Sequence, residues 1–497
     1  MLTPQFVLPL AGELVVDLFA GGGGASTGIE QAIGRHVDIA INHDPEAVAL
    51  HQVHHPQTRH FVSDVFEVDP LAVTDGLPVA LLWASPDCKH FSKAKGGKPV
   101  NKKIRSLAWV VVKWAKLVAP RVICLENVEE FQTWGPLAAD GRPCQQRKGK
   151  TFARWVAQLR NLGYTVEWRE LRACDYGAPT IRKRLFLVAR RDGQPIVWPE
   201  PTHCAPDSLP VRQRKLKPWR TAAECIDWSI PAPSIFERER PLADATCRRI
   251  AKGIMRYVVT NPNPFIVEDE HGESRAHRAA QEAARSVQAS SPGHDRVGPV
   301  GAPREAAETG AKSGSGARSA PSLVTAFIAK HYTGVVGSEL VDPMATITSV
   351  DHHSLVAANM VPIDNQSSTD EPLHTISAQG AHHAEVRAFL IKYYGTDQDP
   401  QLREPLHTVT TKDRFGLVTV KGEPYAIVDI GLRMLTPREL YRAQGFPESY
   451  QIDKGADGRP LTKTAQVRMC GNSVCPPLAR ALVAANYTEA QSMRAAA

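Results

Sequence analysis

The sequence predicts an α/β protein with a mostly parallel sheet, to which a β-rich region is added. Over roughly the first 190 residues, short apolar runs alternate with helical stretches, as in sheets crossed over by helices. Four glycines, Gly21 to Gly24, separate the first apolar run from the first helical stretch. A strand, a glycine-rich turn and a helix form the opening unit of nucleotide-type folds. The β-rich region is predicted from a short motif that recurs after residue 340.

The elements of the α/β part follow in order along the chain. Strands are expected at residues 14–20, 37–41, 79–84, 121–125, 164–171 and 185–189. Helices are expected at residues 25–33, 45–54, 107–118 and 152–162, and nearer the C-terminus at 438–444 and 477–486.

Length and composition bound the class of protein. The 497 residues suggest two to three domains, and a hydrophobic content of 43% is that of a globular chain. No apolar run approaches the roughly 18 residues of a membrane span, and the first residues lack the charged leader of a secretory signal. Nine cysteines without framework spacing indicate reduced thiols, so we expect a cytoplasmic protein. The net charge of +7 permits a polyanionic partner without establishing one.

The region after residue 198 contains an insertion and repeats. Residues 268–320 are rich in Ala, Gly, Ser, Arg and Glu and are predicted to be disordered. Residues 342–347 (DPMATI) recur at 371–376 (EPLHTI) and 404–409 (EPLHTV), with aromatic strands expected at 327–332 and 389–394. Such a period is typical of a small β-rich unit used several times, and a purely structural module remains an alternative.

Four segments carry candidate chemistry. The glycine turn fits NAD, FAD, S-adenosylmethionine or no ligand, and it lacks the lysine of a P-loop. Cys88 follows the third strand, where it is either a thiolate nucleophile or a buried structural cysteine. Glu126 ends the fourth strand as either an acid that contacts a substrate or a helix cap. Arg182 and Arg184 share one face of a strand, where they bind an oxygen-rich group or line a solvated edge.

Taken in order, these segments resemble the DNA (cytosine-5) methyltransferase family of prokaryotes and phages. The matching motifs are residues 17–24 (DLFAGGGG) with Ser26 and Gly28, residues 85–88 (SPDC) with Phe91 and Ser92, residues 126–128 (ENV), the Arg182–x–Arg184 pair, residues 438–447 (RELYRAQGFP), and residues 471–474 (GNSV) with Pro476. The resemblance spans nearly the whole chain.

The resemblance implies a mechanism and a cofactor. Cys88 would attack carbon 6 of a flipped-out cytosine, Glu126 would bind ring nitrogen 3 and the exocyclic amine, and Arg182 and Arg184 would bind the base's oxygen and nearby backbone. S-adenosylmethionine would supply the methyl group. The implied cofactor-binding residues are Asp17, Phe19, Ala20, Gly21, Gly23, Asn42, His43, Asp64, Asn472 and Ser473. No metal is implied.

Three positions depart from the family pattern. Asn42 stands where a ribose-binding glutamate is usual, Asp87 replaces a proline before the nucleophile, and Thr180 replaces a glutamine. Asp44 is an alternative ribose contact. None of these changes removes a group that makes or breaks bonds, so activity is still expected.

The family pattern also implies the domain organisation: a catalytic domain from residues 1–198 and 429–497, and a target-recognition domain at 199–428. Its partner would be double-stranded DNA, with a cognate restriction endonuclease as a further possible partner and a monomer as the expected state. The alternatives are an RNA cytosine methyltransferase, a catalytically inactive DNA-binding homologue and, more remotely, a different Rossmann-type enzyme. The long recognition region favours duplex DNA, and the presence of Cys88, Glu126 and Arg184 favours an active enzyme.

Overall fold

A computed structural model describes residues 12–86, 107–138, 142–267, 323–331, 335–350, 352–362, 386, 389–390, 417–420 and 423–487. The chain forms two compact units. The first comprises Met1–Asp227, Val341–His352 and Leu435–Ala497, and the second Trp228–Leu340 and His353–Met434. Residues 199–227 and 341–352, which the sequence analysis assigns to the recognition domain, therefore belong to the first unit. The predicted insertion at 268–320 lies outside the described residues.

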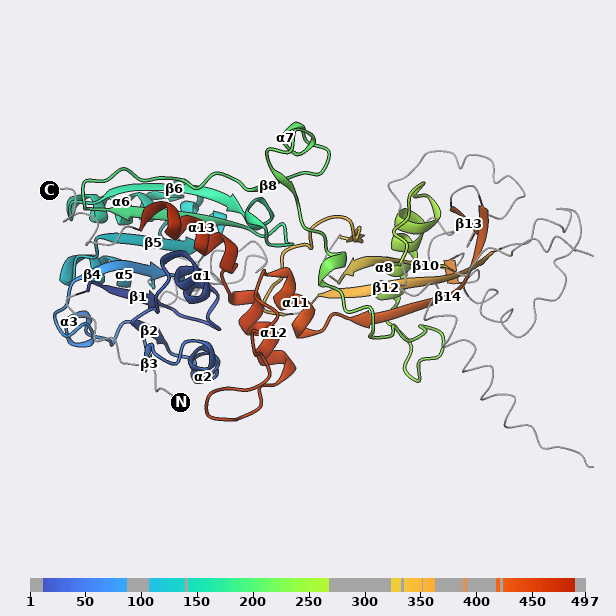
Figure 1. Ribbon diagram of the computed structural model, residues 1–497, viewed down its shortest axis with the longest axis horizontal. Coiled ribbons are helices and arrows are strands. Elements are labelled where there is room, and N and C mark those ends of the chain that lie inside the picture. The colour runs from blue at the N-terminus through green and yellow to red at the C-terminus, as the bar shows by residue number, and fades with distance from the viewer. Residues whose placement is uncertain are drawn as a thin grey trace, which may run out of the picture. The chain divides into compact units, whose positions relative to one another are not determined.

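A seven-stranded sheet forms the centre of the first unit (Figure 1). Its spatial order is β3 (Arg59–Val62), β2 (Ile39–Asn42), β1 (Leu14–Leu18), β4 (Val79–Ala84), β5 (Val122–Asn127), β7 (Lys183–Arg190) and β6 (Thr165–Arg172). All neighbouring pairs are parallel except those made by β7, which runs opposite to both β5 and β6. The predicted mixed α/β fold with a mostly parallel sheet is confirmed.

Helices cover both faces of this sheet. Those of the first unit are α1 (Gly24–Ile33), α2 (Pro45–His54), α3 (Pro70–Val73), α5 (Trp109–Leu117), α6 (Lys150–Asn161), α7 (Leu209–Arg212), α11 (Pro437–Ala443), α12 (Lys463–Asn472) and α13 (Pro476–Asn486). Shorter 3-10 turns are η2 (Glu129–Thr133), η3 (Gln145–Arg147), η4 (Ala173–Tyr176) and η5 (Ala223–Cys225), and β8 (His203–Cys204) pairs with β9 (Lys217–Pro218).

The two faces have separate apolar cores. Trp114 of α5 and Trp155 of α6 pack on one face with Leu82 and Leu125, while α1 and α13 pack on the other with Trp83. Every residue of β4 is buried, because a parallel strand between two helical layers has no solvated side. Such strands are continuous apolar runs in the sequence, which is why β4 and β5 were predictable.

The sequence analysis missed one strand of the sheet. β3 (Arg59–Val62) reads RHFV, and its residues are exposed or half-buried at the edge of the sheet. An edge strand needs no continuous apolar run, because only part of its surface meets the core. The helix expected at 107–118 begins two residues later, at Trp109.

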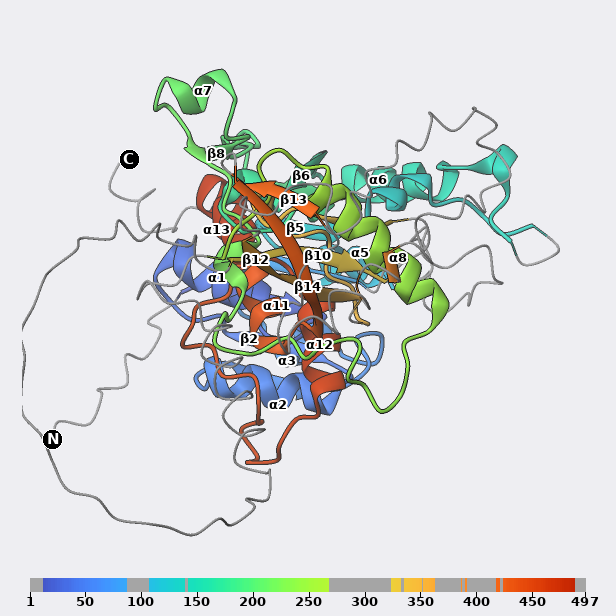
Figure 2. The ribbon, with the colours of Figure 1, turned by 90° about the vertical axis from the view of Figure 1, so that its right-hand side faces the viewer.

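The second unit contains a five-stranded antiparallel sheet. Its order is β11 (Gly337–Ser338), β10 (Leu323–Lys330), β12 (His353–Pro362), β14 (Glu423–Met434) and β13 (Leu417–Val420). Strands β10, β12 and β14 run side by side in both views (Figures 1 and 2). Helix α8 (Asp244–Ile254) continues into a π-helical turn, η6 (Met255–Val259), and both pack on this sheet through an apolar cluster that includes Ile254 and Phe327.

Of the three repeat copies, only the first lies among the described residues. The first copy, residues 342–347, lies in the first unit and forms no strand, only a single bridge from Met344 to Thr180. The copies at 371–376 and 404–409 lie outside the described residues. The strand expected at 327–332 corresponds to β10. The one expected at 389–394 is wrong where it is described, because Phe389 and Leu390 are helical.

Within the described part of the chain, no helix has both the length and the apolar character needed to cross a membrane.

Candidate active site

The turn after β1 has a backbone conformation that presents amide groups. Phe19 has φ of 63° and Gly23 has φ of 91°, both in the left-handed region. Gly23 is the N-cap of α1, so the capping position carries no side chain that could bond to the amide groups of the first turn. Among the described atoms, none lies within 4 Å of the position that a Cβ would take at Gly21. The turn therefore offers helix amides and an open backbone surface to an anionic or zwitterionic ligand.

The C-terminal segment holds the other side of this turn. The Tyr450 hydroxyl donates to the Gly22 carbonyl oxygen at 2.5 Å, and Tyr450 is buried. A Cβ at Gly24 would collide with the Ser473 hydroxyl, so glycine is required there for close approach. Ser473 is buried and donates to the Val474 carbonyl, whereas Asn472 is exposed. Residues 450–473 thus complete the site from a distant part of the chain.

Asn42 at the end of β2 is engaged in local hydrogen bonds. Its Nδ2 donates to the Ala20 carbonyl at 2.9 Å, and its Oδ1 accepts from the Asp44 amide at 2.9 Å. The Asp44 carboxylate caps α2 and forms an ion pair with Arg468. His43, between them, is exposed. The Asn42 side-chain amide therefore links the residues that follow β1 to the end of β2. The neighbouring His43 side chain points to solvent.

Asp17 and Asp64 occupy different environments. Asp17 is 1% exposed, and its Oδ2 accepts from the Ser26 hydroxyl at 2.7 Å. Burial raises the pKa of Asp17 to about 7, against the opposing effect of that hydrogen bond. Asp64 follows β3, is exposed, and accepts from the Phe66 amide through its carboxylate. Only Asp64 offers its carboxylate to solvent.

A second group of residues gathers where β5 and β7 meet. Glu126, the penultimate residue of β5, is 7% exposed, and its Oε1 lies 3.2 Å from Arg184 Nε. The neighbouring Asn127 donates from Nδ2 to the Pro86 carbonyl at 3.0 Å. Pro86 is the last described residue after β4, so Asp87 and Cys88 lie outside the described residues. The structure thus brings Glu126 and Arg184 together beside the start of the Cys88 segment.

Arg182 takes a different direction from Arg184. It is 4% exposed, and Nη1 donates to the carbonyl oxygens of Ile347 at 3.1 Å and Gly471 at 3.0 Å. Thr180, one of the three departures from the family pattern, is buried and accepts from the Arg182 amide at 3.3 Å. The sequence analysis gives the two arginines a common role, but they have different partners in the structure. Arg182 donates to backbone carbonyl groups, and Arg184 forms an ion pair with Glu126.

A small pocket joins these groups. Its lining combines polar groups from β5 and β7 with apolar groups from α13: Glu126, Ala173, Arg182, Arg184, Phe186, Val474, Cys475 and Leu478. The Cys475 thiol donates to Gln444 Oε1 at 2.8 Å, and burial raises its pKa to about 11. This thiol is a packing group, because a buried protonated thiol is a poor nucleophile.

Two parts of the site had no sequence signal. Tyr450 is an isolated tyrosine outside the recognised motifs, and only the fold carries it to Gly22. The first repeat copy was attributed to a separate module, yet Met344 exchanges backbone hydrogen bonds with Pro179 and Ile181 at 2.9 Å each. Both contacts join residues more than 160 positions apart, so neither periodicity nor spacing could reveal them.

A family model and several known proteins are similar to this chain in sequence. The family model described as C-5 cytosine-specific DNA methylase matches residues 14–228 and 334–487. Type II methyltransferase M1.HphI of Haemophilus parahaemolyticus is 30% identical over 197 residues, which cover 38% of this chain and 48% of that protein. Type II methyltransferase M.NaeI of Lentzea aerocolonigenes is 32% identical over 195 residues, covering 39% and 44%. The chain thus spans about half or less of the length of these two relatives.

Solved structures also match along most of the chain. The Schizosaccharomyces pombe Dnmt2 methyltransferase has a TM-score of 0.44 and 15% identity, covering 95% of this chain and 97% of that one. A DNA modification methyltransferase encoded in an Escherichia coli prophage has a TM-score of 0.40 and 14% identity, covering 95% and 98%. The family model covers well over half of the sequence, including every described part of the site. The chain belongs to the C-5 cytosine-specific DNA methylase family.

Proposed function

We propose that this protein is a DNA cytosine-5 methyltransferase, which moves a methyl group from S-adenosylmethionine to carbon 5 of a cytosine flipped out of duplex DNA. One observation carries the proposal. Glu126 and Arg184 lie 3.2 Å apart, and Asn127 is bonded to Pro86, two residues before Cys88. An acid, a cation that can bind the base and the residue that leads toward the proposed nucleophile thus lie together at the carboxyl ends of β4 and β5. Open α/β folds bind their ligands at this end of the strands.

The chemistry assigns a separate task to each residue. The Cys88 thiolate attacks carbon 6, and the electron pair of the 5,6 double bond moves to carbon 5, which then accepts the methyl group. Glu126 hydrogen-bonds ring nitrogen 3 and the exocyclic amine, which stabilises the charge that develops in the ring. Loss of the proton on carbon 5 restores the double bond and expels the Cys88 thiolate. Arg184 binds the oxygen of the base and orients Glu126 through their ion pair.

The glycine turn is the proposed cofactor site. When bound, S-adenosylmethionine supplies a methyl group activated by its positively charged sulfur. The open surface at Gly21 and the N-terminus of α1 suit its amino-acid part, and Phe19, Ala20 and Gly23 shape the same turn. We assign Asn42 and His43 to the ribose and Asp64 to the adenine amine. Asn472 and Ser473 would complete the pocket from the C-terminal segment. Asp17 lies beneath the turn and contributes through Ser26.

We assign target recognition to the second unit, together with the repeat copies that the chain carries. Its antiparallel sheet lies in the part of the sequence where this family keeps its recognition domain. Because the curated relatives are named Type II methyltransferases, we extend the proposal to a restriction–modification role with a cognate endonuclease. We propose that the methyltransferase acts as a monomer, since a single chain supplies all the assigned residues.

Covalent trapping tests the chemistry. The full chain is incubated with S-adenosylmethionine and duplex DNA in which 5-fluorocytosine replaces cytosine, because fluorine at carbon 5 prevents the final elimination. We expect a denaturation-resistant protein–DNA complex that Cys88→Ala abolishes. RNA of the same sequence is the matched control for substrate class.

Sequencing of genomic DNA from an expressing host then identifies the methylated sequence. A complex that persists in Cys88→Ala would contradict the assigned nucleophile. Trapping on RNA but not on DNA would replace the DNA substrate with RNA. The absence of methylation and of any complex on pooled genomic fragments would contradict the proposed activity.

A further inference from the structure

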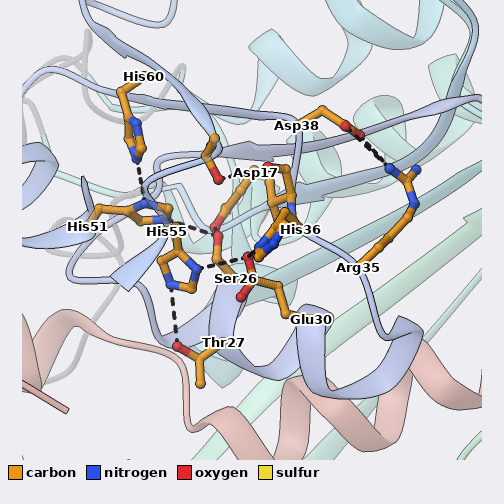
Figure 3. A network of polar contacts seen from close by, with 12 residues as sticks. Asp17, Ser26, Thr27, Glu30, Arg35, His36, Asp38, His51, His55 and His60 are labelled. Atoms are coloured by element: carbon orange, nitrogen blue, oxygen red, sulfur yellow. Dashed lines mark hydrogen bonds and ion pairs between the residues drawn. The ribbon is translucent and has the colours of Figure 1, made fainter. Parts of the chain in front are cut away.

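A continuous row of polar side chains joins four elements, β1, α1, α2 and β3, beneath the glycine turn. Ser26 Oγ of α1 lies 2.7 Å from Asp17 Oδ2 of β1, and His51 Nε2 of α2 lies 3.0 Å from Ser26 Oγ. His51 Nδ1 then lies 2.8 Å from Nε2 of His60 on β3. Figure 3 shows the four side chains pointing toward one another in this order. We call Asp17, Ser26, His51 and His60 the polar row.

The polar row leads from the interior to the surface. Asp17 is 1% exposed, and Ser26 and His51 are 0% exposed. His60 is half-buried on the edge strand β3. A carboxyl group with no direct access to water is thus joined to a partly solvated imidazole by three hydrogen bonds. Within the described residues, Asp17 Oδ1 has no hydrogen-bond partner, so Ser26 is the polar contact of this carboxyl group.

Each contact in the row holds one proton, so with neutral imidazoles the three hydrogen bonds must point in the same direction. If Asp17 is protonated, it donates to Ser26, Ser26 donates to His51 Nε2, and His51 Nδ1 donates to His60 Nε2. If Asp17 is ionised, every donor and acceptor is exchanged. The two arrangements use the same heavy-atom positions and differ by one proton.

The surroundings favour the protonated arrangement. Asp17 is 1% exposed and its Oδ1 has no hydrogen-bond partner among the described residues, so the ionised carboxylate would have little solvation. Burial raises the pKa of Asp17 to about 7 and lowers the pKa of both His51 and His60, which keeps the imidazoles neutral. His60 Nε2 faces His51, so Nδ1 is the ring nitrogen that can exchange a proton outside the row.

Other titratable groups surround the row without joining it. His55, the C-cap residue of α2, lies beside His51 with ring centroids 4.4 Å apart and ring planes tilted by 44°, and its Nδ1 lies 2.9 Å from Glu30 Oε1 of α1. Glu30 also faces His36. His54 stacks on Tyr450 and faces Arg438. The carboxylate of Glu30 thus has two imidazole partners of its own, whereas the hydrogen bond of Asp17 is made within the row.

We propose that Asp17 is a proton-binding site beneath the cofactor turn, that the polar row connects it to solvent, and that binding of the positively charged cofactor expels its proton. The inference rests on the proposed function. Asp17 lies two residues before Phe19, and its partner Ser26 lies in the first turn of α1, beside the glycine turn assigned to the cofactor. A positive charge nearby favours the ionised form of a carboxyl group.

The proton step balances when the water that accepts the proton is included. Asp17 passes its proton to Ser26 Oγ as the Ser26 hydroxyl proton moves to His51 Nε2. The Nδ1 proton of His51 moves to His60 Nε2, and His60 Nδ1 releases its proton to water. One proton leaves the protein, Asp17 is left with a negative charge, and both imidazoles end neutral. Ser26 and His51 are therefore positioning residues, because they hold and exchange a proton without touching the substrate.

Calorimetry with two ligands tests the proposal on the full chain. S-adenosylmethionine and S-adenosylhomocysteine share their amino-acid and nucleoside groups, but only the first carries a positively charged sulfur. Each is titrated near pH 7 in buffers of different ionisation enthalpy, so that the slope of heat against that enthalpy counts protons. We expect S-adenosylmethionine to release up to about half a proton more than S-adenosylhomocysteine, since Asp17 with a pKa of about 7 is then about half protonated.

Variants assign that proton to the polar row. Asp17→Asn should abolish the difference between the two ligands. Ser26→Ala removes the hydrogen bond that favours ionised Asp17, so it should move the extra proton release to higher pH. His36→Gln, which changes an exposed histidine outside the row, is the matched control and should leave the difference unchanged. Infrared difference spectra provide a second measurement, in which S-adenosylmethionine should remove a protonated-carboxyl band from the wild-type protein.

The outcomes separate this inference from the proposed function. If both ligands bind with equal proton release, or if Asp17→Asn keeps the difference, the proton site is overturned and the proposed activity is untouched. If neither ligand binds, the proposed function itself fails. Should Asp17→Asn not fold, the Ser26→Ala shift and the wild-type infrared band decide, and their joint absence overturns the inference.

Discussion

Arg182 Nη1 donates to the carbonyl oxygen of Gly471 at 3.0 Å, which joins residues 289 positions apart in the chain. The same nitrogen donates to Ile347 at 3.1 Å, and Arg182 is 4% exposed. One guanidinium group thus ties the start of β7 to the first repeat copy and to the segment that leads into α13. Its position is decided by three distant parts of the sequence.

Loss of this guanidinium group should destabilise the first unit. Arg182→Ala leaves two buried carbonyl groups without their charged donor, and we expect it to lower the free energy of unfolding by about 3 kcal/mol. Lys183→Ala is the matched control, because the adjacent Lys183 is largely exposed and its ion pairs with Glu129 and Glu170 should contribute less than about 1 kcal/mol. Urea denaturation measures both, and equal effects would contradict a special role for Arg182.

Glu126→Gln should affect chemistry more than folding. The amide keeps the shape of the carboxyl group but loses the charge that pairs with Arg184 and the capacity to exchange a proton with the base. We expect methyl transfer to fall by about 10²- to 10⁴-fold, with cofactor affinity unchanged. Single-turnover transfer from labelled S-adenosylmethionine gives the rate. Glu224→Gln, at an exposed pair with Arg220, should leave it unchanged, and full activity in Glu126→Gln would exclude the assigned role.

The stability of the protein should depend on Asp17 between pH 6 and pH 8. Its pKa is raised from 3.8 to about 7 by burial, so the folded state binds this proton more tightly than the unfolded chain. The resulting stabilisation is complete below pH 3.8 and is lost as the pH rises through about 7. Relative to Asp17→Asn, the wild-type protein should lose about 1.4 kcal/mol between pH 6 and pH 8.

The contribution of His51 to stability has the opposite pH dependence, but it does not affect the comparison of the wild-type protein with Asp17→Asn. Burial lowers its pKa well below 6.5, so its contribution to stability is present above pH 6.5 and is lost as the pH falls below that value. Both proteins retain His51, and its contribution largely cancels. Urea midpoints at pH 6 and pH 8 measure the slope, and parallel slopes in the two proteins would show that Asp17 does not titrate in this range.

Tyr450→Phe should weaken both stability and cofactor binding. The hydroxyl donates to Gly22 in a buried site, so its removal should cost about 1–2 kcal/mol and loosen the glycine turn. Tyr176→Phe removes a comparable hydroxyl that donates to the Pro199 carbonyl, away from the turn. We expect similar losses in melting temperature but a weaker affinity for S-adenosylmethionine in Tyr450→Phe alone. Equal affinities in the two variants would remove Tyr450 from the cofactor site.

Much of the first unit was predictable because its signals are local. β4 is a continuous apolar run, and β5 opens with one at residues 122–125 before Glu126 and Asn127, since burial on both faces favours apolar residues along a strand. The glycine turn and the residues at the strand ends, such as Glu126, are visible at fixed offsets from these runs. β3 was missed because an edge strand lacks that run. The first repeat copy forms no strand itself and docks through backbone bonds to Ile181, a contact that leaves no pattern in the sequence.

The sequence by itself determined the α/β class, the order of strands and helices, and the residue types available to the site, because these depend on periodicity and on neighbours close in the chain. Only the tertiary structure decided that Arg184 faces Glu126 while Arg182 turns to Gly471 and Ile347. It alone also assembled the polar row from Asp17 to His60. Burial and hydrogen-bond direction depend on packing between distant segments, and packing controls both the partner of a side chain and the protons that it holds.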